Sequence, residues 1–197
     1  MFIELTDHLR CPAEHAESFL VLIPDEMGGR EVRRGVLGCP VCQREYPIRD
    51  GVVHFSEGTR VVTPPPAGGA VNAGAIAAFL GLEGPGGYVG LIGEAASYAA
   101  GLSGLLAGIH LVAVNPPGGF SPGETLSVLL SPGIPFKRGS FRGIVLGGPF
   151  GGEAAWAEGA VQSVLPGLRA VGRGPTPQFD GFELMGEAEG WWVGKKR

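Results

Sequence analysis

Residues 39–55 read CPVCQREYPIRDGVVHF, and they open with the C-x2-C pair Cys39-Pro40-Val41-Cys42. A tight turn of this kind aims two thiolates and several backbone N–H groups at one point, which suits tetrahedral zinc. Cys11 is the third cysteine, and no cysteine follows residue 42. An odd number of clustered cysteines favours a bound metal over a disulfide. The sequence therefore predicts a zinc site in the first part of the chain.

The fourth ligand of this site has to be another type of residue. His15 is the best candidate, because its four-residue offset from Cys11 lets the imidazole reach the same metal; His8, three residues before Cys11, is the alternative. Three free buried cysteines are the competing interpretation, which leaves the paired Cys-Pro turn unexplained. With four protein ligands the site would be structural and would supply much of the folding energy of a small module. The expected ligands are Cys11, His15, Cys39 and Cys42.

The residues around the cysteines indicate a small β module. Residues 19–23 and 31–37 are expected to form two strands joined by a turn. The segments 9–12 and 39–55 resemble the bacterial zinc ribbons related to the methyltransferase-activating subunit of tRNA and ribosome modification. This resemblance covers residues 1–56, although the usual second cysteine of the first knuckle is absent. His54 lies in an apolar strand and is expected to pack in the core rather than bind metal.

A Pro/Gly-rich stretch at 57–71 contains three consecutive prolines and predicts a linker. Beyond it, residues 72–197 alternate between segments with helical and strand patterns, which indicates an α/β domain with a mostly parallel sheet. The expected helices are 72–82, 94–106 and 154–165, the expected strands are 88–92, 109–114, 126–130, 143–146 and 169–172, and a closing antiparallel pair is expected at 182–185 and 190–194.

Two segments of this second region resemble a known family. Residues 134–146 and 164–172 are similar to characteristic phrases of the Rossmann-like class I methyltransferases, and the resemblance spans roughly residues 72–194. It implies a reduced Rossmann-like fold. It also implies a site for S-adenosylmethionine at the loop after the first strand, where glycines let the backbone approach the cofactor and an acid after the second strand binds the ribose.

The positions that would bind this cofactor are altered. Gly90 stands where the family has an acid, and the second strand ends in Asn115 instead of an acid. Where the family has glycines, this chain has Ile92, Glu94 and Ala96. Their side chains would crowd the path of the cofactor, because each carries a Cβ atom that glycine lacks. The remaining candidates for cofactor contact are Gly90, Gly93 and Asn115. S-adenosylmethionine binding is not expected, and the spacing of residues identifies no catalytic side chain.

The sequence therefore favours a non-catalytic interaction subunit of a larger protein assembly. That assembly is soluble or membrane-bound, and in the second case this chain lies outside the bilayer. The alternative is an active S-adenosylmethionine-dependent methyltransferase with a divergent loop. A third hypothesis, a ribbon module acting on RNA, is disfavoured by the net charge of −4 and the scattered basic residues. The N-terminal residues lack the pattern of a signal peptide, and no segment has the apolar length of a membrane span, so a cytoplasmic location is expected.

Overall fold

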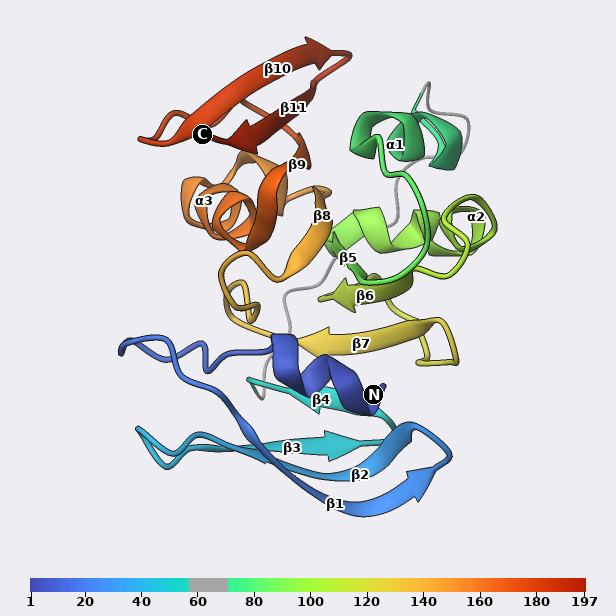
Figure 1. Ribbon diagram of the computed structural model, residues 1–197, viewed down its shortest axis with the longest axis vertical. Helices are drawn as coiled ribbons and strands as arrows, with labels where there is room; N and C mark the ends of the chain where they lie inside the picture. Colours follow the sequence, from blue (N-terminus) through green and yellow to red (C-terminus); the bar gives the residue numbers. More distant parts are fainter. Residues whose placement is uncertain (57–70) are drawn as a thin grey trace.

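In a computed structural model, the chain builds one sheet that runs the length of the molecule (Figure 1). The structure describes residues 1–56 and 71–197, so the expected linker, apart from Val71, lies outside the described residues. The sheet has 11 strands in the order β1-β2-β3-β4-β7-β6-β5-β8-β9-β11-β10. The fold is therefore of the mixed α/β class, with antiparallel strands at both ends of the sheet and parallel strands in its middle.

The N-terminal region, residues 1–56, which we call the ribbon, supplies one end of the sheet. Its four strands pair antiparallel in chain order. The first strand starts two residues later than expected and is longer, because it continues in pairing with the next strand up to a turn at Gly29, whose φ is +63°. The strands are β1 (Val21–Gly28), β2 (Glu31–Gly38), β3 (Glu45–Arg49) and β4 (Val52–His54).

The middle of the sheet consists of parallel strands that are almost entirely buried, as expected for strands covered on both faces. Each of these strands was predicted from its apolar run. They are β5 (Tyr88–Ile92), β6 (His110–Val114), β7 (Leu126–Leu130) and β8 (Phe141–Leu146), and β8 pairs in parallel with β9 (Val164–Arg173).

The far end of the sheet is the predicted antiparallel hairpin, made by β10 (Phe182–Ala188) and β11 (Trp191–Lys196). Strand β11 lies between β10 and β9. Strand β9 starts directly after helix α3 (Ala154–Ser163), so the helix expected over 154–165 is two residues shorter, and the strand expected at 169–172 begins five residues earlier.

Helices cover the two faces of the central strands (Figure 1). Helix α3 and the 3-10 helix η1 (Ile3–His8) pack on one face, and α1 (Ala73–Leu80) and α2 (Ala99–Leu105) pack on the other. The single helix expected over 94–106 is a 3-10 helix, η2 (Gly93–Tyr98), followed by α2. Within the described ranges, no helix combines the length and apolar character needed to cross a bilayer.

The ribbon and the second region are joined directly. Strand β4 pairs in parallel with β7, with Val53 opposite Leu129. Near the start of the chain, the backbone N–H groups of Arg10 and Lys137 donate to the carbonyls of Pro135 and His8 at 2.9 Å each. One apolar core runs from Met1 and Leu37 in the first region to Trp192 in the last strand. The two sequence regions therefore share both a sheet and a core.

Candidate functional site

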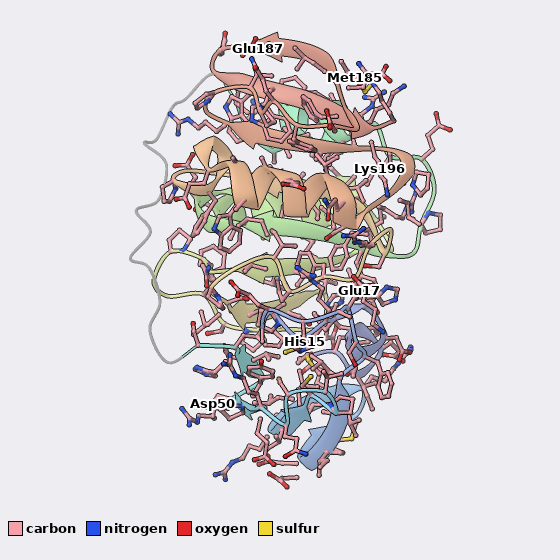
Figure 2. All side chains as sticks on the ribbon, turned by 90° about the vertical axis from the view of Figure 1, so that its left-hand side faces the viewer. His15, Glu17, Asp50, Met185, Glu187 and Lys196 are labelled. Carbon is pink, nitrogen blue, oxygen red and sulfur yellow. The ribbon has the colours of Figure 1, made fainter. Side chains whose placement is uncertain are left out.

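The four predicted metal ligands come together at one end of the ribbon. One ligand atom from each of Cys11, His15, Cys39 and Cys42 lies within 4.8 Å of every other. Figure 2 shows His15 next to the sulfur atoms. The alternative ligand, His8, lies outside this group, and its ring packs instead on Tyr88 with centroids 4.5 Å apart.

The knuckle between β2 and β3 positions two of the thiols. The N–H of Cys39 donates to the carbonyl of Arg44, and the N–H of Gln43 donates back to Cys39, both at 2.9 Å. Gln43 adopts the left-handed conformation with φ 58°, which closes the turn. Burial alone would raise the pKa of Cys39, but backbone N–H groups of Cys42 and Val41 outweigh it and lower the pKa to about 7. This thiol is thus prepared to act as a thiolate ligand.

The loop after η1 supplies the other two ligands. His15 Nδ1 lies 2.7 Å from the carbonyl oxygen of Ala16. A carbonyl can only accept, so Nδ1 carries the proton and Nε2 presents its lone pair toward the cysteines. Holding one imidazole nitrogen in this way is how metal-binding histidines are usually oriented.

Two of the six separations between these atoms match those around a tetrahedral ion. Zinc bonds of about 2.3 Å to sulfur and about 2.0–2.1 Å to nitrogen place two sulfur ligands about 3.8 Å apart, and sulfur and nitrogen about 3.5 Å apart. The distance from Cys11 Sγ to Cys42 Sγ is 3.7 Å, and that from Cys39 Sγ to His15 Nε2 is 3.4 Å. A three-cysteine, one-histidine donor set is one of the common structural zinc sets.

Tyr46, on strand β3, supports the site from outside the ligand set. Its hydroxyl lies 3.0 Å from Cys11 Sγ. Burial and this hydrogen bond raise the pKa of Tyr46, so the phenol keeps its proton and donates it toward the sulfur. Such a bond stabilises a thiolate ligand and fixes its direction. The sequence analysis gave Tyr46 no role, and only its position four residues after Cys42 pointed to it.

The carboxyl end of β5, where the methyltransferase resemblance places the cofactor, and that of its neighbour β8 are filled with side chains. Glu94 is 7% exposed, and its carboxylate accepts a hydrogen bond from the Arg173 guanidinium at 2.8 Å. A Cβ atom at Gly147 would collide with the Glu94 side chain, and one at Gly93 would lie 2.5 Å from the Phe150 ring. Glu94 was expected to start a helix. Its pairing with Arg173, 79 residues away, could not be predicted from spacing.

The remaining cofactor candidates are engaged in packing. The amide of Asn115 is 3% exposed and makes two hydrogen bonds to the backbone of Ser131, at 2.7 and 2.9 Å. Gly90 leaves room for Phe136, whose ring would lie 3.0 Å from a Cβ atom at that position. The polar atoms of Asn115 are therefore already paired within the protein.

Comparisons with known proteins do not assign the chain to a family. The sequence matches no protein-family model, and no curated protein matches it significantly. The assignment of function thus depends on the site itself.

Proposed function

We propose that this chain is a non-catalytic interaction subunit, built from a zinc ribbon and a methyltransferase-like framework that does not bind S-adenosylmethionine. The order β7-β6-β5-β8-β9 supports the framework. Counted from residue 71, these are the third, second, first, fourth and fifth strands. This is the order of a doubly wound nucleotide-binding sheet, and all four pairs are parallel.

The observation that carries the proposal is the packing at the point where this strand order reverses. Ligands of doubly wound sheets bind outside the carboxyl ends of the strands at that point. Here it is the space between the ends of β5 and β8, where Glu94, its partner Arg173 and the Phe150 ring lie. A nucleoside entering this space would have to displace a buried carboxylate and break its ion pair, which is costly.

We further propose that the metal is zinc and that its role is structural. All four proposed ligands are protein side chains, so the ion would have no open position for water or substrate. When bound, zinc would cross-link the η1 loop to the β2–β3 knuckle. Cys11 and Cys39 are buried, and Cys42 and His15 are half-buried, so the ion would be shielded from solvent on one side.

The ribbon also presents apolar side chains on which a protein partner could dock. Val21 and Ile23 lie in the edge strand β1 and Phe19 lies two residues before it, and these side chains are 45%, 57% and 59% exposed. Side chains at this spacing lie on the same face of a strand. Clustered exposed apolar groups are typical of interaction surfaces.

Calorimetry with the zinc-loaded protein tests the loss of the cofactor site. We expect no heat of binding when S-adenosylmethionine is titrated in up to millimolar concentration. One-to-one binding in the micromolar range would contradict the proposal and support the active methyltransferase. A thermal unfolding transition measured on the same sample verifies that the protein is folded.

The interaction role is tested by the size of the native species. In a lysate of its own cells, the chain should elute on size exclusion well above its 20.3 kDa mass. The double variant Phe19→Ser, Ile23→Ser should shift it toward the monomer position. Elution of the unaltered chain as a monomer would contradict the proposed role.

A further inference from the structure

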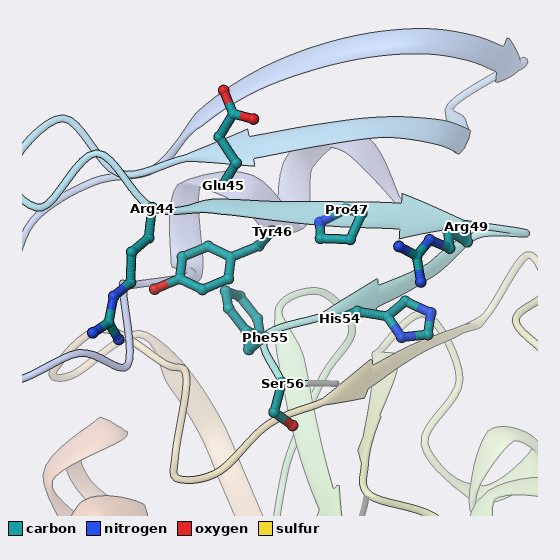
Figure 3. A pocket seen from close by; sticks show the side chains of 8 residues that line it. All are labelled: Arg44, Glu45, Tyr46, Pro47, Arg49, His54, Phe55 and Ser56. Carbon is teal, nitrogen blue, oxygen red and sulfur yellow. The ribbon is translucent and has the colours of Figure 1, made fainter. Parts of the chain in front are cut away.

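A second site lies on the ribbon, in a cavity of about 420 Å³ between strands β3 and β4 (Figure 3). Arg44 stands at one end of it, and Arg49 and His54 stand together at the other. The rings of Tyr46 and Phe55 lie between the two ends, with centroids 4.9 Å apart. The hollow therefore has a rigid aromatic middle and positively charged ends.

The charges of this hollow are not balanced within the described part of the chain. Arg44 and Arg49 are exposed, and neither belongs to any of the ion pairs formed by the described residues. Glu45 is the one acidic residue among the lining residues that the structure describes, and Figure 3 shows its carboxylate directed away from Arg49 and His54. Among the described residues, the interior of the hollow thus faces guanidinium groups and an imidazole with no carboxylate between them.

The imidazole of His54 responds to this charge. Partial burial and the positive charge of Arg49 lower its pKa. Arg49 and His54 come from paired strands, with Arg49 opposite Val52 in the register, so the ladder holds them near each other. At neutral pH the imidazole is therefore mostly uncharged, and the pair offers an anion one guanidinium and one neutral N–H donor.

We propose that this hollow binds a phosphate group of a small phosphorylated ligand, contacted by Arg49 and His54, with Arg44 adding positive charge at the far end. A guanidinium binds phosphate through two parallel N–H donors. Phosphate also offers oxygens on several sides, and can therefore take donors from β3 and β4 together, whereas a carboxylate offers two oxygens in one plane. The inference is independent of the S-adenosylmethionine question, because this site lies in the ribbon.

Two basic residues and an imidazole favour a small ligand over a nucleic acid. Nucleic-acid binding needs an extended basic surface that neutralises many phosphates. Here the net charge is −4, and the lining includes just two arginines. Tyr46 and Phe55 are 5% and 6% exposed, so their faces are taken up by packing and cannot stack against successive bases.

The test is a titration of the full, zinc-loaded chain at low salt with inorganic phosphate and pyrophosphate, followed by calorimetry and by the NMR signals of the His54 imidazole. We expect saturable one-to-one binding that moves the His54 signals. Arg49→Ala should weaken binding about tenfold or more, since it removes a charge-assisted contact. Arg44→Ala should weaken it roughly two- to threefold through the loss of a more distant charge.

Arg34→Ala is the matched control, because Arg34 is an exposed arginine of the same ribbon outside this hollow, and its loss should leave affinity unchanged. The proposal is overturned if neither probe saturates or if Arg49→Ala binds as the parent does. Binding of citrate as tight as that of pyrophosphate would assign a carboxylate ligand instead. Tighter binding of a single-stranded oligonucleotide, with several phosphates engaged, would assign a nucleic acid.

Discussion

At the scale of single residues, the metal centre depends on how His15 is held. Its Nδ1 is tied to the carbonyl of Ala16, which leaves Nε2 free to point at Cys39. The sequence favours His15 as the fourth ligand and leaves His8 as the alternative, because both are a few residues from Cys11. The structure distinguishes them by their surroundings, since the His8 ring packs against the rings of Tyr88 and Phe141.

Substitution of these two histidines gives a direct comparison. We expect His15→Ala to lower the zinc content of the purified protein well below one ion per chain, or its zinc affinity about tenfold or more. His8→Ala should retain one zinc, whatever it costs in stability. Metal analysis after dialysis against a weak chelator measures both. Full zinc in His15→Ala together with loss in His8→Ala would reverse the assignment.

His110 makes the folded protein sensitive to acid. Its ring is stacked on Phe2 with centroids 4.7 Å apart, and its Nε2 lies 3.0 Å from the Ser127 hydroxyl. Burial, reinforced by the amino group of Met1, lowers the pKa of His110 from 6.5 to about 4. The unfolded chain therefore binds this proton first as pH falls, so stability is complete above pH 6.5 and decreases between about pH 6.5 and pH 4.

We expect this loss to be about 1–2 kcal/mol between pH 7 and pH 5, after allowing for partial exposure of the ring. Urea unfolding midpoints at several pH values measure it. In His110→Gln the loss of unfolding free energy between pH 7 and pH 5 should be smaller by that amount. The metal ligands titrate equally in both proteins, so the difference between the two slopes isolates His110. Equal slopes would show that the imidazole is not responsible.

At the scale of elements, the loop that leads into β5 is held by one side chain of β8. The guanidinium of Arg142 donates to the carbonyls of Glu83, Gly84, Pro85 and Gly86. The loop is rich in glycines with positive φ, including Gly86 and Gly87, so it gains little order from its own residues. Arg142 was not predicted as a structural residue, because its contacts with this loop are set by the tertiary fold.

Arg142→Ala should therefore destabilise the protein by about 1–2 kcal/mol, because several carbonyls lose a charged donor. Arg138→Ala removes the same charge from an exposed position nearby and should cost less than about 0.5 kcal/mol. Chemical denaturation of the two variants makes the comparison. If both variants lose the same small free energy of unfolding, the contacts of Arg142 with the loop contribute nothing to stability.

The elements themselves were well predicted where a local pattern decides them. The buried strands β5 to β8 are apolar runs bounded by glycine and proline, and the spacing of the predicted metal ligands is typical of zinc sites.

Contacts that are set by the tertiary fold could not be predicted from the sequence. The Glu94–Arg173 pair and the Tyr46–Cys11 bond join residues 79 and 35 positions apart. The start of β9 at Val164 was missed because Val164 pairs with Phe141 of β8, whereas Pro166 and Gly167 lie in an irregularity of this pairing that ends at Arg169.

At the scale of the whole molecule, the shared sheet has a consequence for stability. Strand β4 pairs with β7, the loop carrying Cys11 is bonded to the segment before β8, and one core includes residues of both regions. Two parts joined in this way should unfold together, although a ribbon and a linker would suggest separate domains. Metal loss should therefore weaken the entire chain.

Zinc chelation tests this coupling. We expect a single thermal transition both before and after chelation, with its midpoint lowered by about 10 °C or more in the metal-free protein. A structural zinc contributes several kcal/mol to folding, and each kcal/mol shifts the midpoint by about 2–4 °C at this chain length. Near-ultraviolet circular dichroism of the tryptophans, which lie in α3 and β11, reports on the second region. An unchanged tryptophan transition beside early loss of ribbon structure would show two independent domains.

The most direct test of the account is the amide NMR spectrum of the zinc-loaded protein with and without S-adenosylmethionine. Because Glu94, Arg173 and Phe150 occupy the space between the ends of β5 and β8, we predict that the signals of Gly93, Glu94 and Asn115 stay in place at millimolar cofactor. Saturable shifts confined to those residues would show an accessible nucleoside site and contradict the account.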